Sequence, residues 1–503
     1  MLKALSAARW NFQTAAHLLN RAGFGGTPEE IAKVQKLGLD GAVEWLVDYE
    51  KTPDAMKAPE WAEPDPDRLK AFQEAREFRQ KLNSATPEER QALEAKRREM
   101  RRVQQRNQGQ QMVQLRGWWL ARMAKGPRPL QEKLTLFWHG HFATSVQKVK
   151  DAYFMYLQNE TFRRHASGNW LAMLKDVTKD PAMLIWLDQA QSRKQQPNEN
   201  YAREVMELFA LGEGHYTEKD ITEAARAFTG LALNRLEQTS DYRPAGHDDG
   251  EKTVLGKTGR LDWEDVLEQI VAQPQAPKFI CAKLWTFFAA ESPSEELVNA
   301  LAAIFRKHDN QFKPVLRAMF RSEAFYAEPV VRTQVKSPVQ WLVSSARLLE
   351  RELPPAPVAT NMLANLGQNL FAPPNVKGWD GGVTWITTNN LLERYNLAEA
   401  LVYGKNQIRI NADNKALKTV ANRLNRRNAQ PTLVDADKLV GNEDRKSRSA
   451  LIASLERRFL QAELKPKQKQ ALNDYLNSQG ELDSHDILEA IRLVMSTPEF
   501  QLT

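Results

Sequence analysis

The fold class is decided by residues 86–124, which read TPEERQALEAKRREMRRVQQRNQGQQMVQLRGWWLARMA. Thr86 has the side chain of an N-cap, Pro87 suits the first helical position, and Glu89 stands where a capping box places its returning carboxylate. The residues that follow are rich in Ala, Glu, Lys, Arg and Gln, which all favour a helix. This stretch therefore predicts a long helix that begins at Thr86.

The same composition extends back to Pro64, with a break near residues 83–85, so we expect a long helical hairpin at about 64–124. Its second arm has few large apolar residues before Leu115, Trp118 and Trp119. The basic residues of that arm include Lys96, Arg97, Arg98, Arg101, Arg102 and Arg106. We expect the arm to be solvated along its length and to pack only at its base.

Apolar residues at helical spacing predict further helices at residues 130–142, 151–164, 198–211, 218–229, 263–273, 277–290 and 337–349. Alternation typical of strands is almost absent, and Gly and Pro concentrate at 241–259 and 372–382, which we expect to be loops. The sequence therefore predicts a mainly α, multi-helix assembly with a protruding hairpin, long Gly/Pro-rich loops and little or no sheet. We expect a main helical domain at 1–402 that includes the hairpin, and a helical subdomain at 403–503 that packs on it.

The composition is that of an ordinary globular protein, with 42% hydrophobic and 26% charged residues among 503. A single cysteine, Cys281, excludes an intrachain disulfide and a cysteine-based metal cluster. No stretch approaches the roughly 20 apolar residues that span a bilayer, so we expect no integral membrane segment. The first residues show no signal peptide, since Arg9, Asn11 and Gln13 interrupt the apolar run.

The densest polar cluster lies at residues 197–220. Helical spacing places four of its side chains around one helix face: Asn200, Arg203, Glu204 and Glu207. One interpretation is a capped helix with intrahelical ion pairs. The other takes Glu204 and Glu207 as a carboxylate pair that holds a hard cation or acts as a general acid and base, with His215 as a further nitrogen ligand.

A second cluster, FWHGHF at residues 137–142, contains His139 and His141 on either side of Gly140. Two such histidines cannot face the same way on a regular helix, but a break at Gly140 would bring both toward one cleft. They would then serve a metal or a proton transfer, with His139 in catalysis and His141 as a ligand. The alternative is that both are hydrogen-bonded core residues.

The loop at 372–385 combines rigid prolines, permissive glycines and two tryptophans. We expect Asn375 and Trp379 to present a polar edge and an aromatic face to a ligand, including a sugar. Alternatively, Trp379 and Trp385 anchor the loop to the helices. Elsewhere the chain has no P-loop, dinucleotide fingerprint or Gly-x-Ser-x-Gly elbow in a fitting context, which disfavours nucleotide enzymes and the usual serine hydrolases.

Together these motifs resemble the family catalogued as domain of unknown function 1800. The resemblance covers nearly the whole chain and includes HLLNRAGFG at 17–25, FWHGHF at 137–142, NENYARE at 198–204, PNVKGW at 374–379 and STPEFQ at 496–501. The first of these motifs contains Arg21, which we count among the ligand-binding candidates. The resemblance implies no activity. It does imply an envelope or extracellular role beside a sulfatase- or phosphatase-like partner protein, because family members often look exported and are commonly encoded next to such proteins. The missing signal peptide leaves the location of this chain open.

Three functions follow from these patterns. The first is an envelope-associated binding or assembly factor that works with a partner protein. The second is a metal-assisted hydrolase with a divalent metal and a carboxylate and histidine site built from Glu204, Glu207, His139, His141 and His215. The third, a non-specific nucleic-acid binder, rests on Arg-rich runs near 96–106 and 423–458 and ranks last, because acidic residues intersperse both runs.

Overall fold

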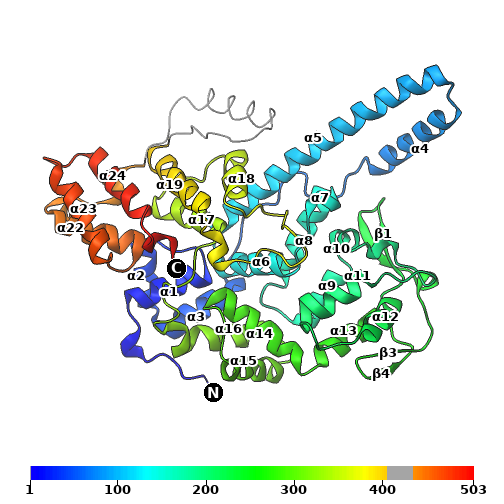
Figure 1. Cartoon of the computed structure of the whole chain (residues 1–503), viewed down its shortest axis with the longest axis horizontal. Helices are drawn as coiled ribbons and strands as arrows, with labels where there is room; N and C mark the ends of the chain where they lie inside the picture. Colours follow the sequence, from blue (N-terminus) through cyan, green and yellow to red (C-terminus); the bar gives the residue numbers. More distant parts are fainter. Residues whose placement is uncertain (1, 405–433) are drawn as a thin grey trace.

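The structure, a computed structural model, describes residues 2–404 and 434–503. It is 64% helical, which confirms the mainly α fold (Figure 1). Among the described residues the strands form only two two-stranded antiparallel sheets, built from β1 (Leu231–Asn234) with β2 (Thr239–Tyr242) and from β3 (Lys252–Val254) with β4 (Lys257–Gly259). Part of the basic run near 423–458 lies outside the described residues, including Arg423, Arg426 and Arg427.

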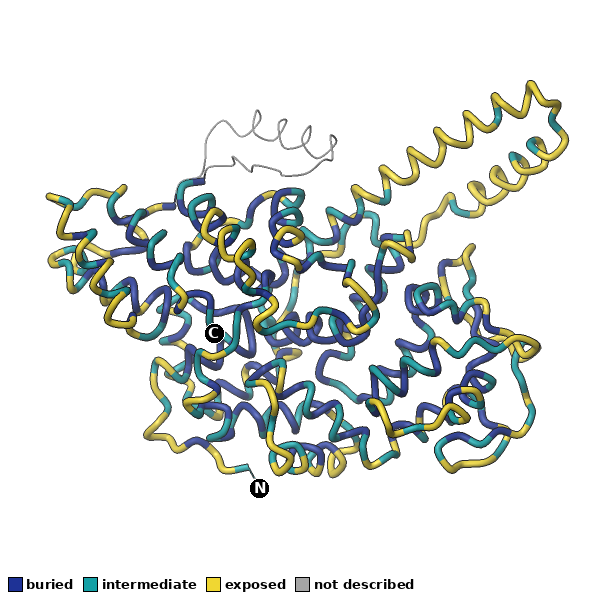
Figure 2. The backbone as a smooth tube through the Cα atoms, in the orientation of Figure 1, coloured by how far each residue is buried: buried dark blue, intermediate teal, exposed yellow. Residues whose placement is uncertain are grey.

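The two longest neighbouring helices form a hairpin where the sequence predicts one. They are α4 (Arg68–Ser84) and α5 (Pro87–Lys125), and the capping box at Thr86 is present. No residue of α4 is buried, and the buried residues of α5 begin at Met112. The hairpin therefore stands away from the body and is exposed along most of its length (Figures 1 and 2).

The body beneath the hairpin is made of helices that pack in two hydrophobic clusters. The first cluster gathers residues from the N-terminal helices α1 (Phe12–Ala22), α2 (Pro28–Lys36) and α3 (Gly38–Val47), and from α6 (Pro129–His141), α9 (Trp170–Thr178), α10 (Pro181–Trp186), α11 (Glu199–Glu204), α12 (Glu218–Ala227), α13 (Trp263–Ala272), α14 (Gln275–Phe288), α15 (Glu295–Lys307) and α16 (Phe312–Arg321). This cluster carries the family motifs at residues 17–25, 137–142 and 198–204.

The second cluster joins the base of α5 to the C-terminal part of the chain. It gathers residues from α7 (Val146–Val149), α8 (Ala152–Arg164), α17 (Pro338–Leu348), α18 (Ala356–Asn365), α19 (Thr388–Tyr403), α21 (Ala436–Leu439), α22 (Arg448–Leu455) and α24 (Ser484–Met495), together with two leucines of α23 (Pro466–Ser478). The C-terminal helices thus share their core with the rest of the chain. The domain boundary at 402 stays a prediction.

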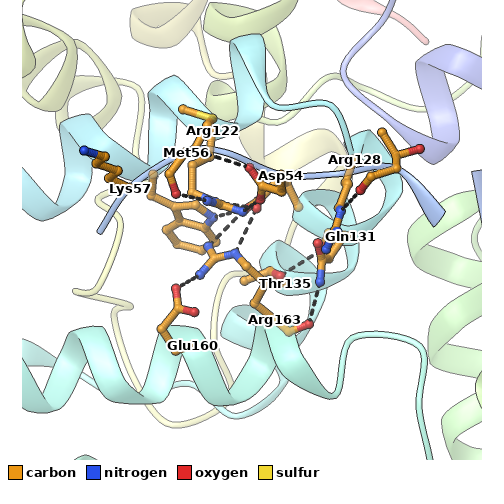
Figure 3. Close-up of polar contacts among 12 residues, drawn as sticks. Asp54, Met56, Lys57, Arg122, Arg128, Gln131, Thr135, Glu160 and Arg163 are labelled. Atoms are coloured by element: carbon orange, nitrogen blue, oxygen red, sulfur yellow. Dashed lines mark hydrogen bonds and ion pairs between the residues drawn. The ribbon is translucent and has the colours of Figure 1, made fainter. Parts of the chain in front are cut away.

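A buried ion network fixes the base of the hairpin (Figure 3). Glu132 of α6 accepts hydrogen bonds from Arg122 of α5 at 2.7 Å and from Arg163 of α8 at 2.8 and 3.0 Å. Arg122 also pairs with Asp54, and Arg163 also pairs with Glu160. Burial alone would raise the pKa of Glu132, but the two guanidinium groups more than offset it and hold that pKa below its usual value. Every charge in this network has a partner, so its role is to hold α5, α6 and α8 together.

Among the described residues no helix is both long and apolar enough to cross a membrane.

Candidate functional site

A cleft of about 920 Å³ opens between α6 and α14. The α6 wall consists of residues spaced three and four apart, which share one face of a helix: Lys133, Leu136, Phe137, Gly140 and His141. The α14 wall follows the same rule, with Lys278, Phe279, Ala282, Lys283, Thr286 and Phe287. A cleft of this size accommodates a small organic ligand.

The Gly/Pro-rich loop forms a third wall, to which Lys377, Trp379, Asp380 and Trp385 contribute. The loop reaches α6 at Gly378, whose φ is +88° and whose Cβ, if it had one, would lie 2.4 Å from the carbonyl oxygen of Gly140. Only glycine tolerates both conditions. Trp379 lines the same space, and its role as a ligand-binding residue stays a prediction, while Trp385 is buried and anchors the loop.

The helix break at Gly140 on which the shared-cleft interpretation depends is absent, because α6 continues from Pro129 to His141. Its two histidines accordingly point to different surroundings. His139 is buried against Trp119, Phe371 and Trp379, and its Nε2 accepts a hydrogen bond from the backbone N–H of Phe371 at 2.9 Å. Burial and the Arg116 charge lower its pKa to about 3, so this side chain is a neutral core histidine.

Lys133 lies in the α6 wall with only 3% of its surface exposed. Its ammonium has no hydrogen bond or ion pair to the described residues and contacts only ring faces, at 5.3 Å from the centroid of Phe24 and 5.5 Å from that of Phe287. Burial, and then the charge of Arg21, lower the pKa of Lys133 to about 7. A buried amine without a counter-ion is costly, and such groups concentrate at functional sites.

Lys283 and His141 meet the helix that carries the polar cluster. That helix is α11, and it continues as a π-helix at Val205–Ala210, which frees backbone carbonyls. Lys283 donates to the carbonyl of Leu208 at 3.0 Å, and the Nε2–H of His141 donates to the carbonyl of Phe209 at 3.0 Å. The Nδ1 of His141 is then an acceptor and lies 3.5 Å from Nζ of Lys283.

The charge states of these two groups follow from burial. Burial lowers the pKa of Lys283 to about 8. Burial and the Lys283 charge hold the pKa of His141 well below its usual value. Four lysines line the cleft: Lys133 is buried, Lys278 and Lys283 are half-buried, and Lys377 is exposed. The acidic lining residues Glu291, Glu295 and Asp380 are exposed.

Neither Glu204 nor Glu207 lines the cleft, but the charge of Lys377, a residue of the loop wall, acts on Glu204. Burial, and then the neighbouring charge of Glu207, raise the pKa of Glu204. Glu207 accepts a hydrogen bond from the hydroxyl of Tyr216 at 2.8 Å. The charge of Glu207 therefore acts on the carboxyl of Glu204, as in sites where two neighbouring carboxyl groups take different roles.

The remaining polar candidates lie on the surface. Arg203 makes a two-pronged ion pair with Glu218 at 2.7 and 2.8 Å, and Asn200 is exposed one turn earlier. His215 is exposed and lines a separate shallow pocket of about 310 Å³. Asn375 is exposed, and its side chain accepts from the backbone N–H of Lys377 at 2.9 Å, which shapes the loop.

Arg21 is 1% exposed, and backbone carbonyls occupy its guanidinium. Its Nη2 donates to the backbone carbonyl of Val330 at 2.6 Å. Its Nη1 donates to the backbone carbonyl of Ala289 and to the side-chain oxygen of Gln334, the latter at 2.9 Å. Gln334 also lines the cleft. Arg21 thus acts on the cleft as a fixed positive charge behind Lys133.

The metal site stays a prediction. No three of Glu204, Glu207, His139, His141 and His215 bring ligand atoms within 4.8 Å of one another. Within the described residues only Asp483, His485 and Asp486 do so, and of these Asp486 is half-buried while the other two are exposed.

Sequence reasoning missed both deep lysines. Lys133 precedes Phe137 by four residues and Gly140 by seven, so the helical spacing of the FWHGHF motif places it on the same face. That spacing was the available signal. No pattern in the sequence indicated Lys283, because tertiary packing decides which turn of α14 faces the FWHGHF motif.

Comparison with known proteins gives one match. A family profile described as protein of unknown function, DUF1800, covers residues 17–502. No curated protein matches the chain, and no solved structure matches it.

Proposed function

Because the chain belongs to the DUF1800 family of proteins of unknown function, we propose that it is an envelope-associated binding or assembly factor that works with a partner protein and takes up an anionic ligand in its cleft. The envelope setting and a sulfatase- or phosphatase-like partner rest on the family resemblance. The ligand rests on the cleft itself.

One observation carries the ligand proposal: Lys133 is buried in the cleft wall without a counter-ion. Its neighbour on the same helix, Glu132, is equally buried but has two arginine partners. An anion that enters the cleft would supply the missing partner of Lys133, with Lys283 as a second donor. A charge-assisted hydrogen bond of this kind contributes about 1.5–3 kcal/mol.

The aromatic side chains of the cleft walls also restrict the chemistry of the uncharged part of the ligand. Phe137, Phe279, Phe287 and Trp379 face the same space as the two amines. Aromatic walls bind flat or apolar groups, and the volume exceeds that of a simple inorganic anion. We expect a ligand with one anionic group, such as a phosphate, sulfate or carboxylate, joined to a ring or another apolar part.

The proposal is tested by calorimetric titration of the full chain at pH 6.5 with 4-nitrophenyl phosphate, inorganic phosphate and the uncharged 4-nitrobenzyl alcohol. We expect the first to bind more tightly than the other two. In Lys133→Met its affinity falls about ten- to a hundredfold, which corresponds to the loss of one charge-assisted hydrogen bond.

Lys336 provides the matched control, because it is also buried without an ion pair, over the ring of Phe500, but does not line the cleft. Lys336→Met leaves the affinity unchanged. Equal binding of the alcohol and the phosphate ester, or unchanged binding by Lys133→Met, contradicts the proposal.

A metal-assisted hydrolase is the second candidate, and the raised pKa of Glu204 beside Glu207 favours it, because a carboxyl with a raised pKa holds its proton to a higher pH than an ordinary carboxyl and can act as a general acid. Elemental analysis of the native-metal protein with Glu204→Ala and His139→Ala variants tests for the metal. Release of 4-nitrophenolate in the titration mixture, lost in Glu204→Gln, supports the enzyme. A stable ester favours the binding factor.

A further inference from the structure

The exposed part of the hairpin carries apolar side chains that its two helices leave uncovered. Leu69 and Phe72 of α4 are 57% and 53% exposed, and Met100 and Val103 of α5 are 44% and 47% exposed. We call these four residues the hairpin seam. In each pair the two residues are three apart, which is the spacing of adjacent core positions in a coiled coil.

The seam residues lie at one level of the hairpin. α4 and α5 run antiparallel from the turn at 85–86, and Phe72 and Met100 are about equally far from that turn along the chain. Nearer the turn, Phe78, Leu82 and Leu93 are half-buried. Near the turn, α4 and α5 therefore partly cover the apolar side chains that they carry, whereas farther from the turn the side chains of the hairpin seam are exposed.

The surroundings of the seam are strongly basic. Residues 68–110 contain 12 Lys and Arg against 6 Asp and Glu, a net charge of +6 beside the +7 of the whole chain. Among the described residues, only Arg68 and Arg102 of these twelve take part in an ion pair. A second copy of the hairpin would be repelled, while an acidic partner would be attracted.

We propose that the hairpin seam is a docking site for an acidic amphipathic helix of a partner protein, which completes a three-helix bundle with α4 and α5. A third helix can cover apolar side chains of two antiparallel helices by knobs-into-holes packing. Its acidic flanks would neutralise the arginines around the seam.

The chemistry of the seam favours an acidic helix over two other kinds of partner, a nucleic acid and a lipid surface. A nucleic acid would contact the basic residues but would leave the four apolar side chains in water. A lipid surface requires an apolar stripe along a helix, and the seam instead spans two helices at one level. The buried network around Glu132 fixes the base of α5, so the seam is presented in a set orientation.

This inference rests on the partner element of the proposed function and not on the cleft. The probe is a fluorescent four-heptad peptide with Leu at the a and d positions and Glu at e and g. Its anisotropy is measured with the full chain at several salt concentrations, beside a scrambled peptide, phosphatidylglycerol vesicles and a 30-base-pair duplex. Titration of the same protein with 4-nitrophenyl phosphate reports the cleft separately.

We expect the patterned peptide to bind, the scrambled peptide not to bind, and the affinity to fall as salt rises. Phe72→Ser/Met100→Ser and Arg97→Glu/Arg101→Glu each weaken binding at least tenfold, and all four positions are exposed, so folding is unaffected. Leu37→Ser/Leu392→Ser, at exposed leucines elsewhere, leaves it unchanged. Retained binding by the seam variant, or seam-dependent binding of vesicles or duplex that exceeds that of the peptide, overturns the proposal.

Discussion

Replacement of Lys133 by Met should make the protein more stable while it weakens ligand binding. The two side chains have similar length, and Met places no charge in the wall. Burial and Arg21 lower the pKa of Lys133 from 10.5 to about 7. One pKa unit corresponds to about 1.36 kcal/mol, so the charged amine costs the folded state on the order of 5 kcal/mol. Replacement of a buried charge by an apolar residue recovers about 1–4 kcal/mol in practice.

The pH dependence of the stabilisation by Lys133→Met distinguishes removal of a buried charge from a simple gain in packing. The unfolded chain binds a proton at Lys133 up to pH 10.5, and the folded chain only up to about pH 7. The penalty is therefore complete below pH 7 and declines as the pH rises toward 10.5. Urea unfolding at pH 6 and pH 9 should show a large stabilisation by Lys133→Met at the lower pH and a smaller one at the higher pH.

Lys336→Met serves as the reference for the assay, because burial likewise lowers the pKa of Lys336 to about 7. It should show the same pH-dependent stabilisation without a change in ligand affinity. A Lys133→Met variant that is less stable than the wild type, or whose gain is the same at both pH values, would refute the view that the amine lacks a counter-ion.

Three further predictions concern the network, the ligand and the loop. Glu132→Gln should destabilise the protein by about 3–5 kcal/mol in urea unfolding, against less than about 1 kcal/mol for the more exposed Glu160→Gln. Because the folded pKa of Glu132 lies below its unfolded value, this difference should be present above about pH 4.5 and disappear as the pH falls. Ligand affinity measured by calorimetry should be constant below pH 7 and decline as the pH rises toward 9, since the lysine that meets the anion must be protonated; a rise in affinity would contradict this. Gly378→Ala, whose Cβ would collide with the Gly140 carbonyl, should weaken ligand binding at least tenfold, whereas Gly214→Ala, which has a similar φ of +82° but open space, should not.

The sequence was sufficient to predict the helices whose signals lie within a few neighbouring residues. The capping box at Thr86 and the apolar spacing in α6, α8 and α14 depend on residues within a few turns, and the structure places helices there. The break at Gly140 failed because one glycine in a helix costs only about 1 kcal/mol. The packing of α6 on its neighbours outweighs that cost, and the loop can approach the Gly140 carbonyl because Gly378 has no side chain.

The site was less predictable, because it depends on which helix face meets which neighbour. Residues 198–211 have the pattern of one continuous helix, and nothing in their spacing indicates the π-helix at Val205–Ala210. That π-helix directs the carbonyls of Leu208 and Phe209 toward Lys283 and His141. His141 of the histidine motif lines the cleft together with Lys133 and Lys283, whereas its role as a metal ligand stays a prediction.

Glu132 and Lys133 illustrate why burial alone does not identify a functional residue. They are adjacent on α6, they carry opposite charges, and both are almost fully buried. Glu132 faces Arg122 and Arg163, so its charge is compensated within the protein and it binds three helices together. Lys133 points to the other side, toward a space large enough for a ligand, and nothing within the described chain compensates it. Lys336 is also buried without an ion pair but does not line the cleft, so the cleft beside Lys133, and not burial alone, is the ground for the proposed anionic ligand.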